Sequence, residues 1–380
     1  MMELKLDLSK RYAIALEGGG ARGGYEVGAW KALEEAGVRY DAVSGSSVGA
    51  LNGALMAMHD LENAERLWKN IRFSQVMNVD DERMERVMKG EVRGLSELRT
   101  VLKRAGEIIR DGGFDVEPLR KLLEEVIDEK KVRSSDVNFY IVTYSITDHK
   151  ELDLDAKALP EGELHDMLLA SAYFPAFKHE KLGGKRYTDG GVQDVVPIDS
   201  LVSRGYKDLI VIRIYGVGVE KRVKIPKDVS VTTIAPYAEL GPVLNFSGEQ
   251  SAENLKLGYF DAKRVLYGLY GKTYYIDRTL TEDEAYELLA ELIKNAEGTC
   301  SLRALHEELL PALAHETGAK GDYYDVFTAF LEKTAAELEI DPFEIITDKA
   351  LYERVRSERR SKAPQKPSRL LALLPLQVQE

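Results

Sequence analysis

The sequence has few of the residues and segments that would place it in several common protein classes. Its single cysteine, Cys300, excludes an internal disulfide framework and leaves no set of thiolates for a metal site. No segment approaches the roughly 18 uninterrupted apolar residues that a transmembrane helix needs, and the first residues lack the apolar run of a signal peptide. The sequence therefore predicts a soluble, cytoplasmic protein, with contact at the periphery of a membrane as a further option.

Acidic residues exceed basic ones, and they are unevenly distributed. The formal net charge of −12 argues against nucleic acid as a partner. Residues 279–355 hold 18 acidic and 6 basic residues, whereas residues 356–380 hold 6 basic and 2 acidic residues. We therefore predict three parts: a catalytic domain over 1–278, an acidic helical module over 279–355, and a basic tail with a short apolar end over 356–380.

The first 60 residues alternate between two kinds of apolar pattern. The segments "RYAIALEG" and "YDAVSGSS" are short apolar runs typical of buried strands, and each precedes a segment with helical apolar spacing. This order of strand, helix, strand and helix predicts an α/β fold with a parallel sheet. Residues 281–355 are predicted to be wholly helical, and residues 115–131 to form one helix capped by Asp115.

A glycine cluster follows the first predicted strand. Gly18, Gly20 and Gly23 satisfy G-x-G-x-x-G between a strand and a helix, and Asp41 follows about 20 residues later. One hypothesis is therefore a dinucleotide-binding site, in which the glycines admit a pyrophosphate to a helix N-terminus.

The next strand-to-helix junction favours different chemistry. Residues 45–49 read Gly45-Ser46-Ser47-Val48-Gly49, the G-x-S-x-G form of a nucleophile elbow, in which Gly45 and Gly49 allow a sharp turn and Ser47 projects its hydroxyl. The alternative is an ordinary tight turn in which Ser46 or Ser47 caps the helix.

A nucleophilic serine requires a base, and the histidines are poor candidates. His306 and His315 lie in the acidic module, and only His179 precedes a turn near the predicted site. Asp189 is the better candidate, because it ends a strand and is followed by Gly190 and Gly191. A carboxylate in a partly apolar cleft has a raised pKa and accepts a proton directly. The alternative is that Asp189 only closes a turn.

Acyl transfer also needs hydrogen-bond donors for an oxyanion. The glycine cluster beside the elbow would supply them from backbone N–H groups, with Gly19 and Gly20 as first choices. Arg22 is predicted to stabilise this loop or to attract an anionic head group. The full candidate loop consists of Gly18, Gly19, Gly20, Ala21, Arg22 and Gly23.

Taken together, these motifs resemble those of the patatin-like lipid acyl hydrolases. The family pattern is matched in order by "GGGARG" at 18–23, "GSSVG" at 45–49 and "DGG" at 189–191, with "ASAYFPAF" at 170–177 similar to a segment that precedes the family's aspartate. The resemblance covers roughly residues 10–275. It implies a three-layer sandwich around a mostly parallel sheet, a Ser47–Asp189 dyad without histidine, no cofactor or metal, and hydrolysis of phospholipid or lysophospholipid esters.

Several alternatives stay open from the sequence. A thioesterase or a short-chain carboxylesterase could use the same dyad, and a lipid-binding module could keep the elbow without activity. Residues 73–114 are a candidate lid, and methionines near the site are candidate lining residues of a lipid channel: Met56, Met58, Met77, Met84 and Met88. The tail could rest on an anionic membrane, fold back on the acidic module, or be a disordered end. The sequence does not determine the oligomeric state.

Overall fold

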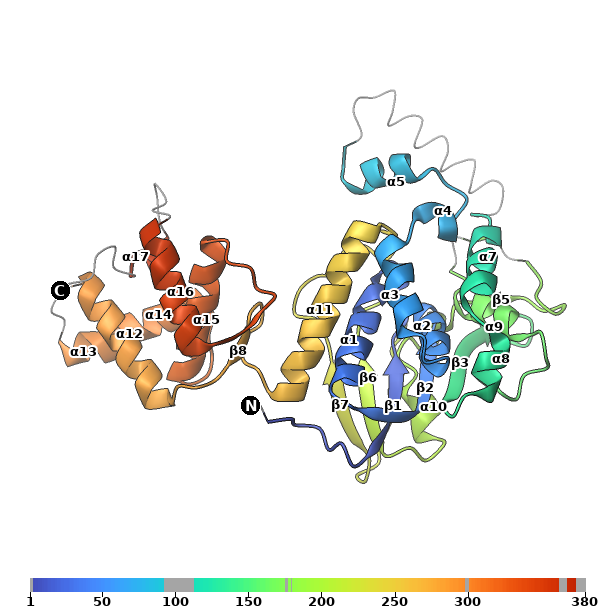
Figure 1. Cartoon of the computed structure of the whole chain (residues 1–380), viewed down its shortest axis with the longest axis horizontal. Helices are drawn as coiled ribbons and strands as arrows, with labels where there is room; N and C mark the ends of the chain where they lie inside the picture. The colour runs from blue at the N-terminus through green and yellow to red at the C-terminus, as the bar shows by residue number, and fades with distance from the viewer. Residues whose placement is uncertain are drawn as a thin grey trace. The chain divides into compact units, whose positions relative to one another are not determined.

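The computed structural model describes residues 3–91, 113–174, 177–178, 180–297, 301–361 and 368–373. They form two compact units, Lys5–Leu266 and a second unit of Met1–Leu4 with Tyr267–Glu380 (Figure 1). Cys300, His179, half of the candidate lid (residues 92–112) and most of the apolar end of the tail lie outside the described residues. In the part of the chain that is described, no helix is long and apolar enough to cross a bilayer.

The first unit is built on a mixed sheet with the order β4-β3-β2-β1-β6-β7. The neighbours β1–β2, β2–β3, β1–β6 and β6–β7 are parallel, whereas β4 and β5 run antiparallel to β3. The predicted α/β fold with a mostly parallel sheet is confirmed. The strands are β1 (Arg11–Leu16), β2 (Arg39–Ser46), β3 (Asn138–Ser145), β4 (Lys150–Asp155), β5 (Tyr187–Thr188), β6 (Asp208–Ile212) and β7 (Ser230–Ile234).

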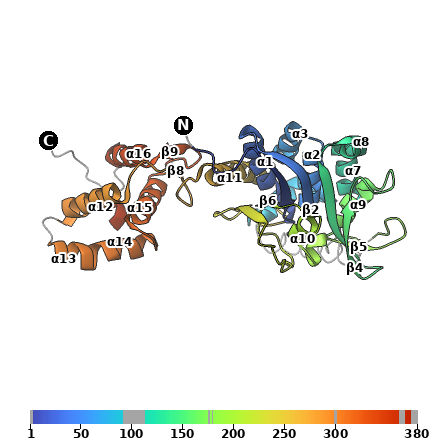
Figure 2. The ribbon, with the colours of Figure 1, turned by 90° about the horizontal axis from the view of Figure 1, so that it is seen from below.

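Helices cover both faces of this sheet, which makes three layers (Figure 2). Alternate residues of β1 face opposite sides, and Ala13 and Ala15 belong to a core cluster with Leu201 of α10. The opposite face is covered by α1, α2, α3 and α11 (Figure 1). The helical segments of this unit are η1 (Gly20–Gly23), α1 (Gly24–Glu35), α2 (Val48–Ala57), α3 (Leu61–Asn70), α4 (Phe73–Val76), α5 (Asp81–Met88), α7 (Glu117–Val126), α8 (Glu129–Ser134), α9 (Leu164–Ser171), η2 (Gly190–Val192), α10 (Ile198–Val202) and α11 (Gly248–Tyr267).

Small residues let α1 and α11 pack with their backbones close together. A Cβ atom on Gly28 would overlap the carbonyl oxygen of Leu255, and one on Gly258 would overlap that of Tyr25. Tyr25 Oη donates a hydrogen bond to Asp261 Oδ2 at 2.9 Å inside this contact. The close contact fixes α1, and with it the glycine-rich turn that precedes α1.

The single helix predicted over 115–131 is instead two helices. The helix α7 ends at Val126, and Asp128 Oδ1 accepts hydrogen bonds from Lys130 N and Lys131 N to cap α8. The predicted capping residue Asp115 accepts a hydrogen bond from Glu117 N, while the N-cap position belongs to Val116. The apolar periodicity therefore predicted helical structure correctly in both segments, and the cap formed by Asp128 divides them into two helices.

The second unit is a helical bundle with one small parallel sheet. The strand β8 (Tyr275–Asp277) pairs with β9 (Ile345–Thr347), so the prediction of a wholly helical segment over 281–355 is wrong at β9. Its core includes buried Phe327, Phe330 and Leu351. Its helical segments are α12 (Glu282–Glu297), α13 (Leu302–Ala304), η3 (Leu305–Leu309), α14 (Leu310–Thr317), α15 (Tyr323–Glu337), α16 (Asp348–Ser361) and α17 (Arg369–Ala372).

The unit boundary lies between Leu266 and Tyr267, earlier in the chain than the expected boundary after 278. The pairing of β8 with β9 accounts for the difference, because it ties residues 275–277 to the second unit. The helix α16 also continues across the expected boundary after 355. The division of the chain into three functional parts stays a prediction.

Candidate active site

Ser47 lies at the junction of β2 and α2, in the conformation of a sharp turn. Its backbone has φ 55° and ψ −125°, an unfavourable region for a residue with a side chain. The flanking glycines permit the turn: a Cβ atom on Gly45 would overlap the Gly49 carbonyl, and one on Gly49 would lie 2.5 Å from the Leu16 carbonyl oxygen. Ser47 occupies the N-cap position, but its side chain makes no capping hydrogen bond. Its hydroxyl is therefore available for another partner.

The pairing of β5 places Asp189 beside the elbow. In β3, Val142 pairs with Ser46 of β2, while Tyr144 pairs with Thr188 of β5. The strand β4 pairs with the other edge of β3, so β5 lies on the same edge of β3 as β2. Since β5 is antiparallel to β3, it runs toward the point where β2 ends. A Cβ atom on Gly190 would lie 2.7 Å from Ser46 Oγ, so the end of β5 contacts the end of β2 directly.

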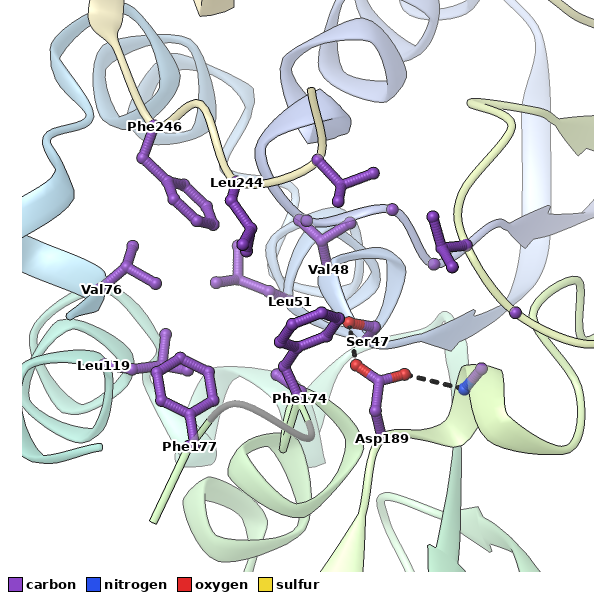
Figure 3. Close-up of a pocket in the computed structure, with 18 of the residues that line it drawn as sticks. Ser47, Val48, Leu51, Val76, Leu119, Phe174, Phe177, Asp189, Leu244 and Phe246 are labelled. Carbon is purple, nitrogen blue, oxygen red and sulfur yellow. Dashed lines mark hydrogen bonds between the residues drawn. The ribbon is translucent and has the colours of Figure 1, made fainter. Parts of the chain in front are cut away.

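Ser47 and Asp189 are hydrogen-bonded to each other (Figure 3). Ser47 Oγ donates to Asp189 Oδ2 at 2.6 Å, and the N–H of Gly191 donates to Asp189 Oδ1 at 2.8 Å. Burial raises the pKa of Asp189 to about 6, although both hydrogen bonds oppose the shift. Asp189 thus closes its turn through one oxygen and contacts the serine through the other.

The glycine-rich loop lies against the elbow. A Cβ atom on Gly18 would stand 3.2 Å from Ser47 Cβ. The φ of +57° at Gly20 favours glycine, and a Cβ atom there would overlap the Val243 carbonyl oxygen. Gly23 is packed so tightly that a Cβ atom would overlap the Trp68 ring. These contacts explain why the loop is rich in glycine.

The backbone N–H groups of this loop divide into two sets. Those of Gly18, Ala21 and Arg22 donate to the carbonyl oxygens of Val195, Val243 and Gly19, so these three residues have no N–H left for an oxyanion, contrary to the wider expectation. Among the described residues, the N–H groups of Gly19 and Gly20 have no such acceptor. Both line the same cavity as Ser47 and Asp189.

Arg22 stabilises loops rather than offering its charge to a ligand. Its Nε donates to the Gly241 carbonyl oxygen at 2.8 Å, and its Nη1 donates to the carbonyl oxygens of Ile214 and Tyr215. Of the two predicted roles, the structure thus favours loop stabilisation over attraction of a head group.

An apolar cavity of about 360 Å³ contains the Ser47–Asp189 pair. In Figure 3 apolar side chains surround the space next to the serine, among them Leu51, Phe174 and Phe246. No methionine and no described histidine lines this cavity. Met56 and Met77 are core residues instead, and Met58 Sδ accepts a hydrogen bond from Asp128 N. The methionine channel expected from the sequence is therefore wrong for this cavity.

Among the further buried carboxyl groups near the site, Asp194 and Glu26 have raised pKa values. Burial raises the pKa of Asp194 to about 7, helped by the nearby charge of Glu151. Burial also raises the pKa of Glu26 well above its usual range, and Glu26 Oε2 accepts a hydrogen bond from Asn52 Nδ2 at 2.8 Å. Asn52 Oδ1 in turn accepts a hydrogen bond from Trp68 Nε1, which fixes one wall of the cavity.

The dinucleotide hypothesis is not supported by the position of Asp41. This residue lies near the start of β2, whereas the glycine-rich loop follows the carboxyl end of β1, and the two strands are parallel. Asp41 therefore lies at the opposite end of the sheet from Gly18 and Gly20. Arg11 Nε lies 2.5 Å from Asp41 Oδ1 and forms an ion pair with it.

Sequence reasoning missed two contributors to the site. Ser171 Oγ accepts a hydrogen bond from Ser47 N at 2.9 Å and donates one to the Val142 carbonyl oxygen at 2.6 Å. The segment 215–219 packs directly on the glycine-rich loop, since a Cβ atom on Gly216 would overlap the Gly18 carbonyl oxygen. The alternation of large and glycine residues in "YGVGV" was a signal that could have identified this segment.

Comparisons with known proteins identify the family of this chain. Patatin-like phospholipase is the family whose profile matches residues 14–202. Patatin-like phospholipase domain-containing protein 7 of Rattus norvegicus is 27% identical over 207 residues, which make up 53% of this chain and 13% of the rat protein. Lysophospholipase nte1 of Aspergillus terreus is 59% identical over 44 residues, 12% of this chain and 3% of that protein.

These matches cover unequal shares of the proteins compared. The chain spans only 3 to 13% of the length of these two curated relatives. The crystal structure of VipD from Legionella pneumophila aligns with 96% of this chain and 90% of its own, at 16% identity and a TM-score of 0.43, a likeness too low to bear on function. Through residues 14–202, about half of its length, the chain belongs to the patatin-like phospholipase family.

Proposed function

We propose that the protein is a serine lipid acyl hydrolase of the phospholipase A or lysophospholipase type. The observation that carries the proposal is the 2.6 Å hydrogen bond between Ser47 Oγ and Asp189 Oδ2 inside an apolar cavity. A nucleophile within hydrogen-bond reach of its base is the arrangement that covalent catalysis requires. An apolar cavity of this size suits an acyl chain better than a polar substrate.

The first half of the reaction forms an acyl-enzyme. Ser47 Oγ attacks the carbonyl carbon of the ester while its proton passes to Asp189 Oδ2. The negative charge that develops on the carbonyl oxygen is stabilised by the N–H groups of Gly19 and Gly20. When the tetrahedral intermediate collapses, the bond to the alcohol breaks, and the departing alkoxide takes the proton from Asp189.

The second half releases the fatty acid. Water attacks the acyl-enzyme carbonyl and transfers a proton to Asp189, and the same two N–H groups stabilise the second oxyanion. Collapse returns the proton to Ser47 Oγ and frees the acid. Asp189 serves as base in both halves because burial places its pKa at about 6, close enough to neutral pH for it to accept and release a proton.

Two observations support a lipid ester as the substrate: the apolar lining of the cavity and the names of the relatives. The lining next to Ser47 is apolar, with Val48 and Leu51 on α2 and Leu244 opposite (Figure 3). Two relatives are named lysophospholipase and patatin-like phospholipase. A thioesterase or a short-chain carboxylesterase acting through the same dyad is the alternative within the hydrolases.

The proposal is tested by incubating the protein with a mixed lipid extract and identifying the species that release fatty acid. We expect release from phospholipids or lysophospholipids, labelling of Ser47 by a fluorophosphonate, and loss of both in Ser47→Ala. Asp194→Asn serves as the matched control, because it removes a buried carboxyl that does not contact Ser47. Retained activity in Ser47→Ala or Asp189→Asn would contradict the dyad, whereas preference for acyl thioesters would favour the alternative.

A further inference from the structure

The segment that follows β6 presents two different faces. Residues Tyr215, Gly216, Val217, Gly218 and Val219 alternate between large and glycine residues. A Cβ atom on Gly216 would overlap the Gly18 carbonyl oxygen, and one on Gly218 would overlap that of Gly191. The glycine face therefore packs against both loops of the candidate active site.

Hydrogen bonds hold this segment to the loop that carries Asp189. Val219 N donates to the Gly191 carbonyl oxygen at 2.8 Å, and Val195 N donates to the Val219 carbonyl oxygen at 2.8 Å. Since Gly191 N also bonds to Asp189 Oδ1, a single residue connects the segment to the proposed base. The segment is thus a fixed part of the rim of the site.

The opposite face of the segment is apolar and exposed. The exposed fractions of Tyr215, Val217 and Val219 are 54%, 75% and 54%, and we call these three residues the apolar ridge. Val192, itself 39% exposed, lines the same cavity as Val217. Val192 and Val217 both line the cavity and extend into solvent, which places the middle of the apolar ridge at the cavity mouth.

The fold holds Tyr215 in a strained conformation that keeps its ring exposed. Its φ of 49° lies in the left-handed region, which is unusual for an aromatic residue. Glu17 Oε2 accepts a hydrogen bond from Tyr215 N at 3.1 Å, and Arg22 donates to its carbonyl oxygen. Such strain persists only where the surroundings impose it, and it is common at functional sites.

Unpaired cations lie at the same edge of the sheet. The turn at 182–185 protrudes past the carboxyl end of β3, since Ile146 N donates to the Arg186 carbonyl oxygen. Lys181, Arg186 and Arg222 are exposed, and no ion-pair partner exists for them within the described ranges. Lys221, adjacent to Arg222, pairs with Glu151 of β4 and so holds its loop at this edge. In the described part of the chain these three cations are not balanced by an ion pair, although the chain as a whole has a net charge of −12.

We propose that the apolar ridge, together with Lys181, Arg186 and Arg222, docks the protein on an anionic lipid bilayer. The ridge enters the head-group region, and the three cations contact anionic head groups, as at other interfacial surfaces. The cavity mouth then opens onto the lipid from which the substrate comes. That a docked lipid becomes the substrate rests on the proposed function, whereas docking on the bilayer requires no hydrolysis.

The test uses the full chain carrying Ser47→Ala, so that binding is measured without turnover. The probes are phosphatidylcholine vesicles with and without 30% phosphatidylserine, and the readout is co-sedimentation. We expect clear binding to the anionic vesicles only. Val217→Ser with Val219→Ser should weaken this binding about 10-fold through lost apolar burial. Equal binding to both kinds of vesicle, or no binding, would overturn the proposal.

A charge-matched pair of variants separates a local surface from general attraction. Lys181→Gln with Arg186→Gln and Arg222→Gln should weaken anionic binding roughly 100-fold, since each cation near the surface contributes about a five-fold effect. Lys130→Gln with Lys131→Gln and Lys227→Gln changes the net charge equally, near the amino ends of β3 and β7. Equal loss in both triple variants would overturn the proposal.

A tryptophan reporter locates the inserted residues and separates this proposal from the proposed function. The two native tryptophans, Trp30 and Trp68, are buried. Val217→Trp in the Ser47→Ala chain should therefore add emission that brominated lipids quench, whereas Lys130→Trp should not. Quenching together with an inactive wild-type enzyme would contradict the proposed function alone. Activity on dispersed monomeric substrate without quenching would contradict the docking surface alone.

Discussion

Ser171 Oγ accepts a hydrogen bond from the backbone N–H of Ser47 at 2.9 Å, although the two residues come from distant parts of the sequence. Ser171 is fully buried at the end of α9, and its hydroxyl donates to the Val142 carbonyl oxygen of β3. The proposed nucleophile is therefore tied to the sheet through a third side chain. This contact restrains a residue whose φ of 55° is unfavourable.

Loss of this contact should impair turnover more than substrate binding. In Ser171→Ala, the Ser47 N–H loses its acceptor, so the elbow is free to relax and the serine loses its orientation toward Asp189. We expect kcat to fall about 10- to 100-fold, with KM changed less than three-fold, because misplacement of a reacting group acts on the transition state. Steady-state kinetics on the lipid identified in the extract would measure both constants.

Ser251→Ala is the matched control for this prediction. Ser251 is also buried in the first unit, but its Oγ has no hydrogen-bond partner within the described residues. Its removal should leave kcat unchanged. An equal fall in kcat for both variants would show that buried hydroxyls act through general stability rather than through the elbow.

Activity should depend on ionisation of Asp189. Because burial raises its pKa to about 6, the carboxylate needed as base is present above that pH and is lost below it. We expect kcat/KM to fall about tenfold per pH unit below pH 6 and to level off above pH 7. The pH profile of kcat/KM reports on the free enzyme and is the appropriate measurement.

Asp194 is the group most easily mistaken for the source of this pH dependence, since its pKa is raised to about 7. Asp194 and Ser47 have different hydrogen-bond partners: Asp194 N donates to the Gly190 carbonyl oxygen, whereas Ser47 Oγ donates to Asp189 Oδ2. Asp194→Asn should therefore keep the acid limb near pH 6. If kcat/KM of Asp194→Asn no longer fell below pH 6, Asp194 rather than Asp189 would be the base.

Asp189→Asn should make the protein more stable while abolishing activity. An aspartate with a raised folded pKa loses folding free energy as the pH rises from about 4 to about 6, and the loss is constant at higher pH. The asparagine variant avoids this loss, so at pH 8 we expect a gain of roughly 1–3 kcal/mol in the free energy of unfolding. Denaturant unfolding of both proteins at pH 8 and pH 4 would measure it, and the gap should close at pH 4.

The contrasting variant for this measurement is Asp228→Asn. Asp228 is exposed, and its hydrogen bond with Lys207 lowers its pKa, so the sign of the effect is opposite. It should give no stabilisation at pH 8. A gain in Asp228→Asn equal to that in Asp189→Asn would indicate a general effect of net charge.

Gly216→Ala should displace the glycine-rich loop. The added Cβ atom would overlap the Gly18 carbonyl oxygen and lie 2.9 Å from Gly19 Cα, so one backbone segment must move. We expect kcat to fall at least 10-fold, because the N–H groups of Gly19 and Gly20 would no longer be aligned. Kinetics and thermal unfolding together would separate a local effect from global unfolding.

Gly37→Ala is the control for Gly216→Ala, because it adds a side chain in a strained backbone conformation without displacing the glycine-rich loop. Gly37 has φ +77°, and an added Cβ atom would meet no atom within 4 Å. It should lose about 1 kcal/mol of stability but keep its kcat. If Gly37→Ala lowered kcat as much as Gly216→Ala, the effect would come from stability alone.

The part of the cavity remote from Ser47 should control acyl-chain length. Val76 lies away from the serine, near Leu119 and Phe246 (Figure 3). Val76→Trp should fill this part of the cavity and lower kcat/KM for long-chain esters at least 10-fold, while butyrate esters are hydrolysed as before. Competition between long- and short-chain esters would measure the ratio. An unchanged ratio would place the acyl chain elsewhere.

Much of the fold and of the candidate site could be predicted from local sequence. The G-x-S-x-G junction identified the turn at Ser47 because only glycine tolerates the contacts at positions 45 and 49. The apolar runs located β1 and β2, and their alternation with helices gave the parallel sheet. Local sequence did not predict the strand β9, because three residues carry too little periodicity to distinguish a strand from a helix.

The sequence by itself determined which groups were available: a hydroxyl in a strained turn, a carboxylate before two glycines, and a loop without side chains. Only the tertiary structure decided their distances and their environment. The antiparallel pairing of β5 with β3 brings Asp189 to Ser47, and burial there raises the pKa of its carboxyl. Pairing, burial and the contacts of Ser171 depend on residues far apart in the chain, and no local pattern encodes them.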